Sequence, residues 1–252
     1  ADLAGLSAIK IAALTTAQIA ALGTDDFAAL GSAQVAGLTT DQIKVLGTDD
    51  LAAFSTVQVA AFTTSQMAVL GTQQIQSLSV ADFAAFSTTQ LRAFDTSQLQ
   101  ALTTAAIEGL SSTQIAGLTS AQLVALTTQQ VRAIEAADLS ALTTANLSKL
   151  LDDQVKSLTT AQVAALSSSQ VAGLTTGQFA VLSTQSIAGL SSTQVAALTT
   201  AQLVALTTAQ AVAFEAADVA ALSTTQLRAL DPSRITALEP ADFAGLSTTQ
   251  IV

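Results

Sequence analysis

Large apolar side chains recur along the chain with a strict period of eight residues. When the octad Leu14–Ala21 (LTTAQIAA) is lettered a to h, position a falls at residues 6, 14, 22 and onward to 246, and it is Leu, Phe or Ile in all 31 copies. Position f falls at residues 3, 11, 19 and onward to 251, and it is apolar in all 32 copies. No insertion or deletion interrupts the pattern. We therefore expect residues 1–252 to form a single uninterrupted array of about 31 octads, without a linker or a domain boundary.

A weaker and longer period lies over the octads. The segment that begins at Gly109 (GLSSTQIAGLTSAQLVAL) returns ten octads later at Gly189 (GLSSTQVAALTTAQLVAL). Ten octads have therefore been duplicated together.

Position b carries the residues that begin helices. It is Ser or Thr in 21 of 31 copies, and these hydroxyls accept hydrogen bonds from the N–H groups of a first helical turn. Position e, three residues after position b, is Gln in 20 of 32 copies and Asp at most of the others. A hydroxyl residue followed three residues later by such a side chain is the pattern of a capping box. Both prolines, Pro232 and Pro240, occupy position c, the first helical position, where a missing N–H costs nothing. The octad therefore predicts a helix of about seven residues, from position c to the next position a.

Charged residues support the same register. Of 18 acidic residues, 17 lie at positions b to e, and six of the eight basic residues lie at g or h. Acidic groups near the start of a helix and basic groups near its end interact favourably with the helix dipole. The charge pattern thus indicates one short helix in each octad.

Two other architectures could carry an eight-residue repeat. In one continuous helix, eight residues at about 100° each advance about 800°, so the apolar stripe rotates by roughly 80° per octad and defines no face. A β-solenoid is the serious alternative, because short repeats with Thr and Gln rows occur in such folds. However, the a-to-f spacings of five and three do not alternate with period two, and Ala, Leu and Gln favour helices. We predict an all-α solenoid of very short helices, one per octad, that are stable only when stacked.

Composition narrows the possible functions. The chain has no Cys or His, and its net charge of -10 rests on only 26 charged side chains. A base or nucleophile of the usual kinds is therefore lacking, and eight scattered Lys and Arg residues cannot neutralise a row of phosphates. Apolar runs are too short to span a membrane. We expect no enzyme, no nucleic-acid partner and no membrane span, and we nominate no catalytic, cofactor-binding or metal-binding residue.

Two features offer alternatives to a purely structural role. Adjacent acidic residues occur as Asp25/Asp26, Asp49/Asp50 and Asp152/Asp153. These pairs could bind Ca²⁺ weakly, but solvated carboxylates that interact with a helix start explain them as well. Thr fills position c in about two thirds of the octads, and an outward row of hydroxyls could bind ice or a glycan, whereas the simpler interpretation is support of the helix cap. The nine Phe residues all fall at a or f, which predicts a core role.

Octads such as Leu158–Ala165 and Leu198–Ala205 resemble the low-complexity repeat regions of very large bacterial secreted or surface exoproteins, often described as adhesin-like. The resemblance covers the whole chain. It implies a bacterial source, an extracellular or cell-surface location and a role as a rod, spacer or fibre. The alternative is a repetitive binding surface for adhesion, glycan or ice that uses the Thr, Ser and Gln rows.

The ends of the chain carry ordinary octads. The sequence starts at position d with Ala1 and stops at position g with Val252, whereas stacked repeats normally finish with polar capping units. We therefore expect either a longer array or self-association of copies end to end.

Overall fold

The computed structural model describes residues 3–251, and helices are the regular secondary structure that these residues form. The described residues hold thirty α-helices of four to six residues and two short 3₁₀ segments, with no strand among them. The predicted all-α fold with one short helix per octad is confirmed, and the β-solenoid alternative is wrong.

The chain divides into two compact units, Ala1–Ala133 and Ile134–Val252, and each is described by itself. The first unit contains η1 (Leu3–Gly5), α1 (Ala8–Ala12), α2 (Thr16–Ala20), α3 (Thr24–Ala28), α4 (Ser32–Gly37), α5 (Thr40–Lys44), α6 (Thr48–Ala53), α7 (Thr56–Ala60), α8 (Thr64–Met67), α9 (Thr72–Ser77), α10 (Val80–Ala85), α11 (Thr88–Arg92), α12 (Thr96–Gln100), α13 (Thr104–Glu108), α14 (Ser112–Gly117), α15 (Ser120–Ala125) and α16 (Thr128–Ala133). The second contains α17 (Ala136–Ser140), α18 (Thr144–Leu147), α19 (Asp152–Lys156), α20 (Thr160–Ala165), α21 (Ser168–Ala172), α22 (Thr176–Ala180), α23 (Thr184–Ala188), α24 (Ser192–Ala196), α25 (Thr200–Ala205), α26 (Thr208–Ala211), α27 (Ala216–Ala221), α28 (Thr224–Ala229), α29 (Pro232–Ile235), η2 (Pro240–Phe243) and α30 (Thr248–Ile251).

All thirty α-helices begin at position c, as the capping pattern predicts. In α5, Thr39 at position b has an extended backbone, and its hydroxyl accepts a hydrogen bond from the N–H of Gln42 at 3.2 Å. The Gln42 side chain in turn accepts from the N–H of Thr39 at 2.8 Å. This reciprocal pair is the predicted capping box, and it satisfies two backbone donors that a helix start leaves without intrahelical partners.

The helices end earlier than predicted, and position a lies outside them. After α20 the chain turns at Leu166, whose φ of −65° and ψ of 142° are extended. The N–H of Leu166 still donates to the carbonyl of Val163 at 3.2 Å, which closes a tight last turn. Two successive extended residues, a and b, therefore make the corner between helices. The prediction of a helix that includes position a was wrong, because that residue is the corner at which the chain changes direction.

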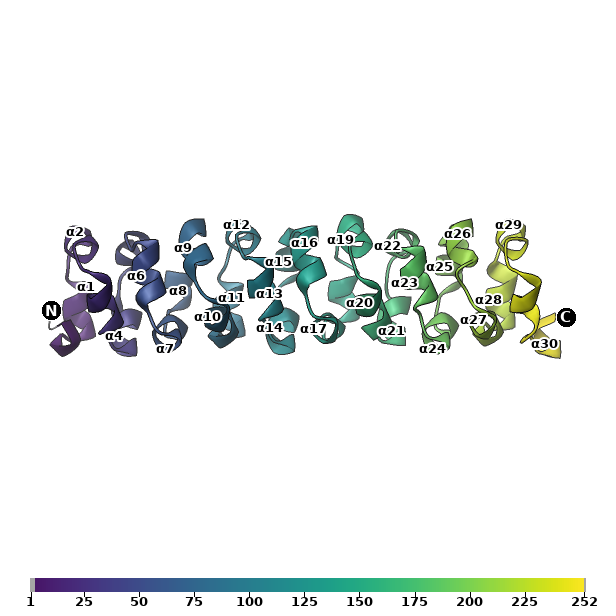
Figure 1. The fold of residues 1–252 in the computed structure, drawn as a ribbon, viewed down its shortest axis with the longest axis horizontal. Coiled ribbons are helices and arrows are strands. Elements are labelled where there is room, and N and C mark those ends of the chain that lie inside the picture. Colours follow the sequence, from purple (N-terminus) through teal and green to yellow (C-terminus); the bar gives the residue numbers. More distant parts are fainter. Residues whose placement is uncertain (1–2, 252) are drawn as a thin grey trace. The chain divides into compact units, whose positions relative to one another are not determined.

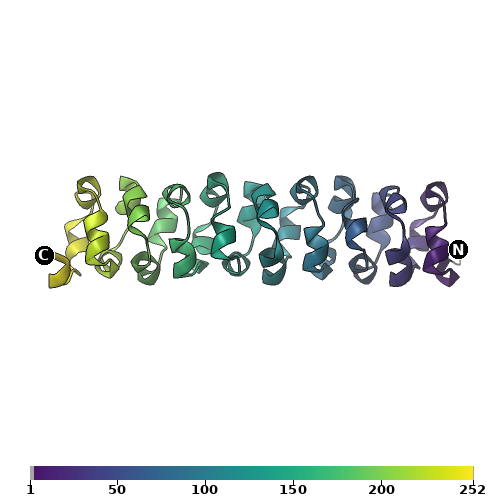
Figure 2. The same cartoon turned by 180° about the vertical axis from the view of Figure 1, so that it is seen from behind.

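Within each unit the helices wind into a coil (Figures 1 and 2). Each helix packs beside the third helix before it, as α4 does on α1 and α20 on α17. Gln42 in α5 reaches the carbonyl of Ile11 in α1, which is four helices earlier. The start of a helix thus meets the end of a helix in the preceding turn.

The interior of the coil consists of positions a and f. Val35 and Ile43 at position f are fully buried, and Leu38 at position a is 4% exposed. Eight of the nine Phe residues are buried, and the ninth, Phe243, is half-buried. The prediction that position-a and position-f aromatics form core is therefore confirmed for those eight. They fill the coil because two large side chains from each octad point inward.

Small residues at position h let the turns approach closely. A Cβ atom on Gly173 would overlap Cγ2 of Thr144, which is at position c in the preceding turn. No residue of the described chain has a positive φ. Gly173 is therefore needed for space between turns and not for an unusual backbone conformation.

Candidate functional site

A row of glutamines at position e joins each turn of the coil to the next. Gln42 is only 1% exposed. Its Oε1 accepts from the N–H of Thr39 at 2.8 Å, while its Nε2 donates to the carbonyls of Ile11 and Leu14 at 2.9 and 2.8 Å. One carboxamide thus caps the start of its own helix and binds the end of a helix one turn earlier. We call this arrangement the glutamine joint.

The glutamine joint recurs through both units with little variation. Within the described residues, eighteen glutamines donate from Nε2 to the carbonyl 28 residues earlier, at 2.6–3.1 Å. They are Gln34, Gln42, Gln58, Gln66, Gln74, Gln90, Gln98, Gln114, Gln122, Gln130, Gln162, Gln170, Gln178, Gln194, Gln202, Gln210, Gln226 and Gln250. Most of them bond a second carbonyl as well, at the end of the same earlier helix, as Gln42 does with Ile11. The joint is therefore the constant polar feature of the fold.

The joint solves the problem that very short helices create. Each helix leaves N–H groups at its start and carbonyls at its end without intrahelical partners, and burying such groups unpaired costs about 1–3 kcal/mol each. The carboxamide supplies one acceptor and two donors, which matches one N–H group and two carbonyls. No buried side-chain nitrogen or oxygen within residues 3–251 lacks a hydrogen-bond partner.

The inter-turn half of the joint was missed from the sequence, although a signal for it was present. The capping box alone accepts Glu as well as Gln at its last position, yet no Glu occurs at position e in the whole chain. A carboxylate can accept the N–H at position b, but it cannot donate to the carbonyls of the preceding turn. The preference for Gln over Glu is therefore consistent with a donor role, although Asp at position e shows that an octad can lack this donor.

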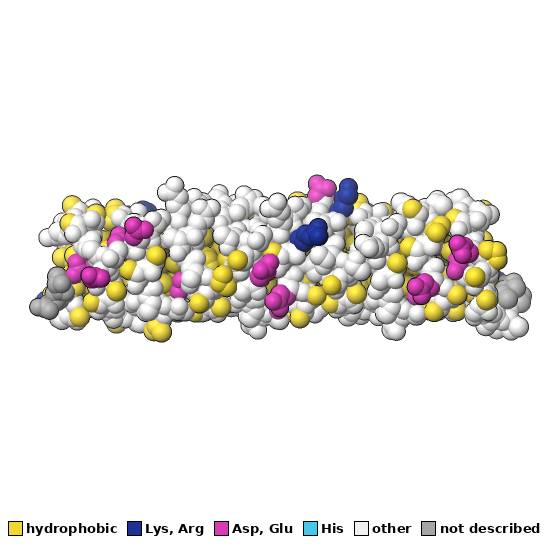
Figure 3. Space-filling model, in the orientation of Figure 1, with side chains coloured by type: hydrophobic (Ala, Val, Ile, Leu, Met, Phe, Trp, Pro, Cys, Tyr) yellow, Lys and Arg dark blue, Asp and Glu magenta, His cyan; other side chains and the backbone are white. Residues whose placement is uncertain are grey.

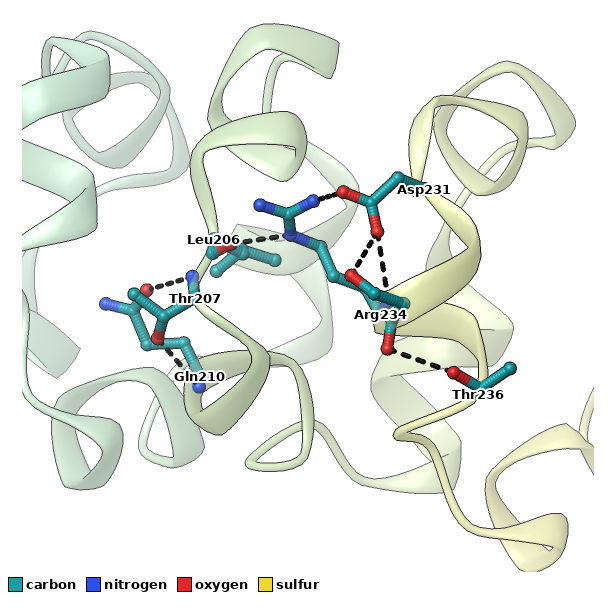
Figure 4. A network of polar contacts seen from close by, with 7 residues as sticks. Leu206, Thr207, Gln210, Asp231, Arg234 and Thr236 are labelled. Atoms are coloured by element: carbon teal, nitrogen blue, oxygen red, sulfur yellow. Dashed lines mark hydrogen bonds and ion pairs between the residues drawn. The ribbon is translucent and has the colours of Figure 1, made fainter.

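One joint uses arginine in place of glutamine. Arg234 occupies position e in α29, and its Nε donates to the carbonyl of Leu206, 28 residues earlier, at 2.5 Å. Its guanidinium also pairs with Asp231 at position b, which accepts from the backbone N–H of Arg234 at 3.1 Å (Figure 4). Gln210 in α26 shows the ordinary capping in the same view, with its Oε1 beside the N–H of Thr207. Arginine has no acceptor for the N–H of position b, so Asp231 makes only the ordinary position-b cap and adds an ion pair with the guanidinium.

Aspartate at position e keeps only the capping half of the joint. The Oδ2 of Asp82 accepts from the N–H and the hydroxyl of Ser79 at 2.9 and 2.7 Å. Asp26 accepts from the N–H of Gly23 at 3.1 Å, and this hydrogen bond lowers the pKa of Asp26 below its ordinary value of 3.8. These carboxylates serve the helix start and bring no donor to the preceding turn.

The acid pairs considered for Ca²⁺ lie at separate helix starts. Asp25/Asp26 lie in the first turn of α3, Asp49/Asp50 in that of α6 and Asp152/Asp153 in that of α19. Asp26 and Asp50 accept from the N–H groups of their own position-b residues. Among residues 3–251, no three acidic, His or Cys side chains gather in a group that could hold a metal ion.

The position-c threonines fall into several rows. Every α-helix begins with position c, and each helix packs on the third helix before it, so the threonines of α2, α5 and α8 follow one another while those of the helices between them lie elsewhere around the coil. Some are also partly covered, because Thr88 and Thr144 lie beneath Gly117 and Gly173 of the following turn. Charged side chains are sparse and scattered on the face shown in Figure 3. The surface of each unit is dominated by small and uncharged side chains.

The short helices, the octad corners and the glutamine joint together define a helical solenoid built from eight-residue repeats. The family model of the ALTTAQ repeat matches residues 1–30, 19–49, 43–80, 80–110, 95–128, 131–168, 153–184 and 171–208. The chain belongs to the ALTTAQ repeat family. A comparison with curated proteins gives no match. Within the described part of the chain, no helix has the length and apolar character needed to cross a membrane.

Proposed function

We propose that the array is a non-catalytic structural element, namely a spacer or fibre-forming part of a secreted or surface protein. The observation that carries the proposal is the glutamine joint. In eighteen described octads it occupies the position-e amide with hydrogen bonds between turns, as Gln42, Gln130 and Gln210 illustrate. An enzyme uses such polar side chains to contact a substrate, whereas here the position-e carboxamides form hydrogen bonds within the array.

The uniformity of the octads supports the same role. Positions a and f remain large and apolar throughout, with Ala211 the only small residue among them, and no octad is lengthened or shortened. A spacer needs a constant advance per repeat, which such an array provides because each octad contacts the same neighbours. Specific recognition needs local departures from the repeat.

The surface supports an exposed location outside the cell. Only eight Lys and Arg residues occur in the chain, so the array offers few cleavage sites to trypsin-like proteases. Its small, uncharged side chains also suit contact with water over a large area. Antibody labelling of intact cells that produce the protein tests this location. Labelling of intact cells is expected, and labelling only after lysis would contradict it.

Replacement of the array tests the spacer role directly. In the protein that carries the array, all octads would be replaced by the consensus Leu-Thr-Thr-Ala-Gln-Ile-Ala-Ala at constant length. A second variant would lack ten octads, the length of the internal duplication. A spacer is expected to tolerate the first change and to lose function in the second. Loss of function in the consensus array, with helicity intact, would show that particular side chains matter and would reject the proposal.

The position-c threonines allow a test against an ice-binding or glycan-binding row. Thr16 and Thr40 begin α2 and α5, which pack against each other, whereas Thr24 begins α3. Replacing Thr16, Thr24 and Thr40 with Val is expected to leave helicity and surface attachment unchanged. Lost attachment to a glycan would favour the binding role.

A further inference from the structure

The octad that begins at Leu150 departs from the repeat at its start. Position b holds Leu151, the only large apolar residue at this position in the chain, whereas 21 of 31 octads have Ser or Thr there. Leu151 is 52% exposed, and its side chain makes no cap hydrogen bond for α19. The octad therefore lacks a favourable cap and presents a leucine side chain to solvent instead.

Leu151 lies at the edge of an open groove within the second unit. The groove has a volume of about 520 Å³, which is within the range of ligand-binding clefts. It runs between the corner that precedes α19 and the start of α22, and these two helices pack against each other. Its lining includes Leu150, Leu151, Asp152, Asp153 and Thr175, and no basic residue lines it. The groove is therefore apolar along one part and acidic along another.

An equivalent groove lies in the first unit, at the same place in the repeat. It has a volume of about 490 Å³, and Lys44, Leu46 and Gly47 are among its lining residues. Leu46 and Gly47 hold the repeat positions of Leu150 and Leu151. No carboxylate lines this first groove. The corner between turns thus forms the groove, and the side chains of each octad set its chemistry.

Two carboxylates are available to a ligand in the groove beside Leu151. Neither Asp152 nor Asp153 has a hydrogen-bond or ion-pair partner among the described residues. Lys149 and Lys156 are the basic residues nearest in the sequence, but they do not line the groove or pair with these carboxylates. Gly177 is the only glycine at position d, and a Cβ atom there would lie 3.4 Å from Oδ2 of Asp152. The absence of a side chain at this position leaves one flank of Asp152 uncovered.

We propose that this groove docks a lysine side chain of a partner protein. The ammonium group binds the carboxylates of Asp152 and Asp153, and the four-carbon stem lies on Leu151. Lysine matches both parts of the groove, because it joins a compact cation to an apolar stem that packs on apolar surface. An acidic segment is repelled by the two carboxylates, and a bare metal ion makes no use of the exposed leucine. The proposal does not rest on the spacer role, since a spacer with one docking point remains a spacer.

A short lysine peptide tests the proposal on the full chain. Acetyl-Gly-Lys-Gly-amide is added while the backbone amide signals of Asp153 and Gly177 are followed by nuclear magnetic resonance. A saturable shift at millimolar concentrations is expected, because so small a ligand binds weakly. Binding should weaken several-fold when the salt concentration is raised from about 0.1 M to about 1 M, since salt screens exposed charges.

The matched control peptide carries acetyllysine in place of lysine. It keeps the stem and loses the positive charge, so it is expected to give no saturable shift. An equal response to the two peptides, or no saturable response to the lysine peptide, would overturn the proposal.

Two variants return single groove positions to residues that the repeat commonly uses, so the fold should be retained. Leu151→Thr removes the apolar contact and supplies the usual cap, and Asp153→Ala removes one carboxylate. Each is expected to weaken binding of the lysine peptide several-fold. Asp49→Ala is the control, because Asp49 is also an exposed position-d carboxylate but lies in the first unit. Undiminished binding in either groove variant, or an equal loss in Asp49→Ala, contradicts the docking of lysine at Leu151.

Sedimentation of the chain alone distinguishes a partner protein from a second copy. Asp153→Ala and the original chain are expected to have the same state of association at equal concentration. If the original chain associates and Asp153→Ala does not, the lysine comes from a second copy, and the assignment to a partner protein is wrong.

Discussion

Arg234 donates from Nε to the main-chain carbonyl of Leu206, 28 residues earlier, at 2.5 Å. The eighteen glutamine joints of the described chain span the same interval with an amide donor. The constant element of the joint is thus a side-chain N–H that reaches the carbonyl ending a helix of the preceding turn. The side chain that carries this N–H can therefore change from one octad to another.

The first prediction follows from this exchange of donors. Arg234→Gln is expected to change the free energy of unfolding by less than about 0.5 kcal/mol, because glutamine makes the same bond. Arg234→Ala leaves the Leu206 carbonyl without its donor and should cost about 1–2 kcal/mol. Urea-induced unfolding, followed by circular dichroism, measures both values. Equal destabilisation by the two variants would show that the guanidinium itself, and not the joint, is required.

The second prediction concerns a glutamine and its exposed neighbour. Gln74 accepts from the N–H of Gly71 at 2.7 Å and donates to the carbonyls of Ile43 and Leu46 at 2.9 Å each. Gln74→Glu keeps the acceptor, loses the donor and directs negative charge at two carbonyls. A loss of about 2–3 kcal/mol is expected from urea unfolding at neutral pH. Gln73→Glu, one residue earlier and exposed, is the control and should change stability by less than about 0.5 kcal/mol.

The result of this comparison distinguishes two descriptions of position e. If Gln74→Glu were as stable as the original chain, the side chain would act only as a helix cap, since Glu caps as well as Gln. The inter-turn bonds would then contribute nothing measurable.

The third prediction tests the close approach of turns at Gly173. A Cβ atom there would overlap Cγ2 of Thr144, so Gly173→Ala should destabilise the second unit by about 1–2 kcal/mol, despite the better helix propensity of alanine. Thr144→Ser removes Cγ2 and should recover most of this loss. Unfolding of the two single variants, the double variant and the original chain gives the coupling energy. Additive effects would contradict the contact between these turns.

The fourth prediction is a pH dependence at the start of α3. The N–H of Gly23 holds the ionised carboxylate of Asp26 and lowers its pKa in the folded chain. A carboxyl group whose pKa is lower in the folded than in the unfolded chain stabilises the fold fully above its unfolded pKa. This stabilisation is lost as the pH falls through the pKa of the folded chain, which lies below 3.8. Titration of the carboxyl carbon by nuclear magnetic resonance measures the pKa. A midpoint at or above 3.8 would contradict the hydrogen bond.

Much of the fold could be predicted from the octad, because helix starts are encoded locally. Thr39 and Gln42 are three residues apart, and their reciprocal capping needs no tertiary information. The corner at Leu166 was harder to predict from the sequence. An apolar residue after a helix can either continue the helix or turn toward the core, and tertiary packing decides which of the two occurs. The bond from Gln42 to Ile11 spans 31 residues, and its partner is a backbone group that carries no sequence signal. The preference for Gln over Glu at position e was the one hint of it, and Asp in other octads weakens that hint.

The most direct test of the account is hydrogen exchange at two adjacent side-chain amides. Gln130 is buried, and its NH₂ group donates to the carbonyls of Leu99 and Leu102 at 2.8 Å each, whereas Gln129 is exposed. Exchange of both NH₂ groups with D₂O is followed by nuclear magnetic resonance in the folded chain. The account predicts slow exchange at Gln130 and exchange at the rate of an unstructured glutamine at Gln129. Equal and rapid exchange at both would contradict the glutamine joint.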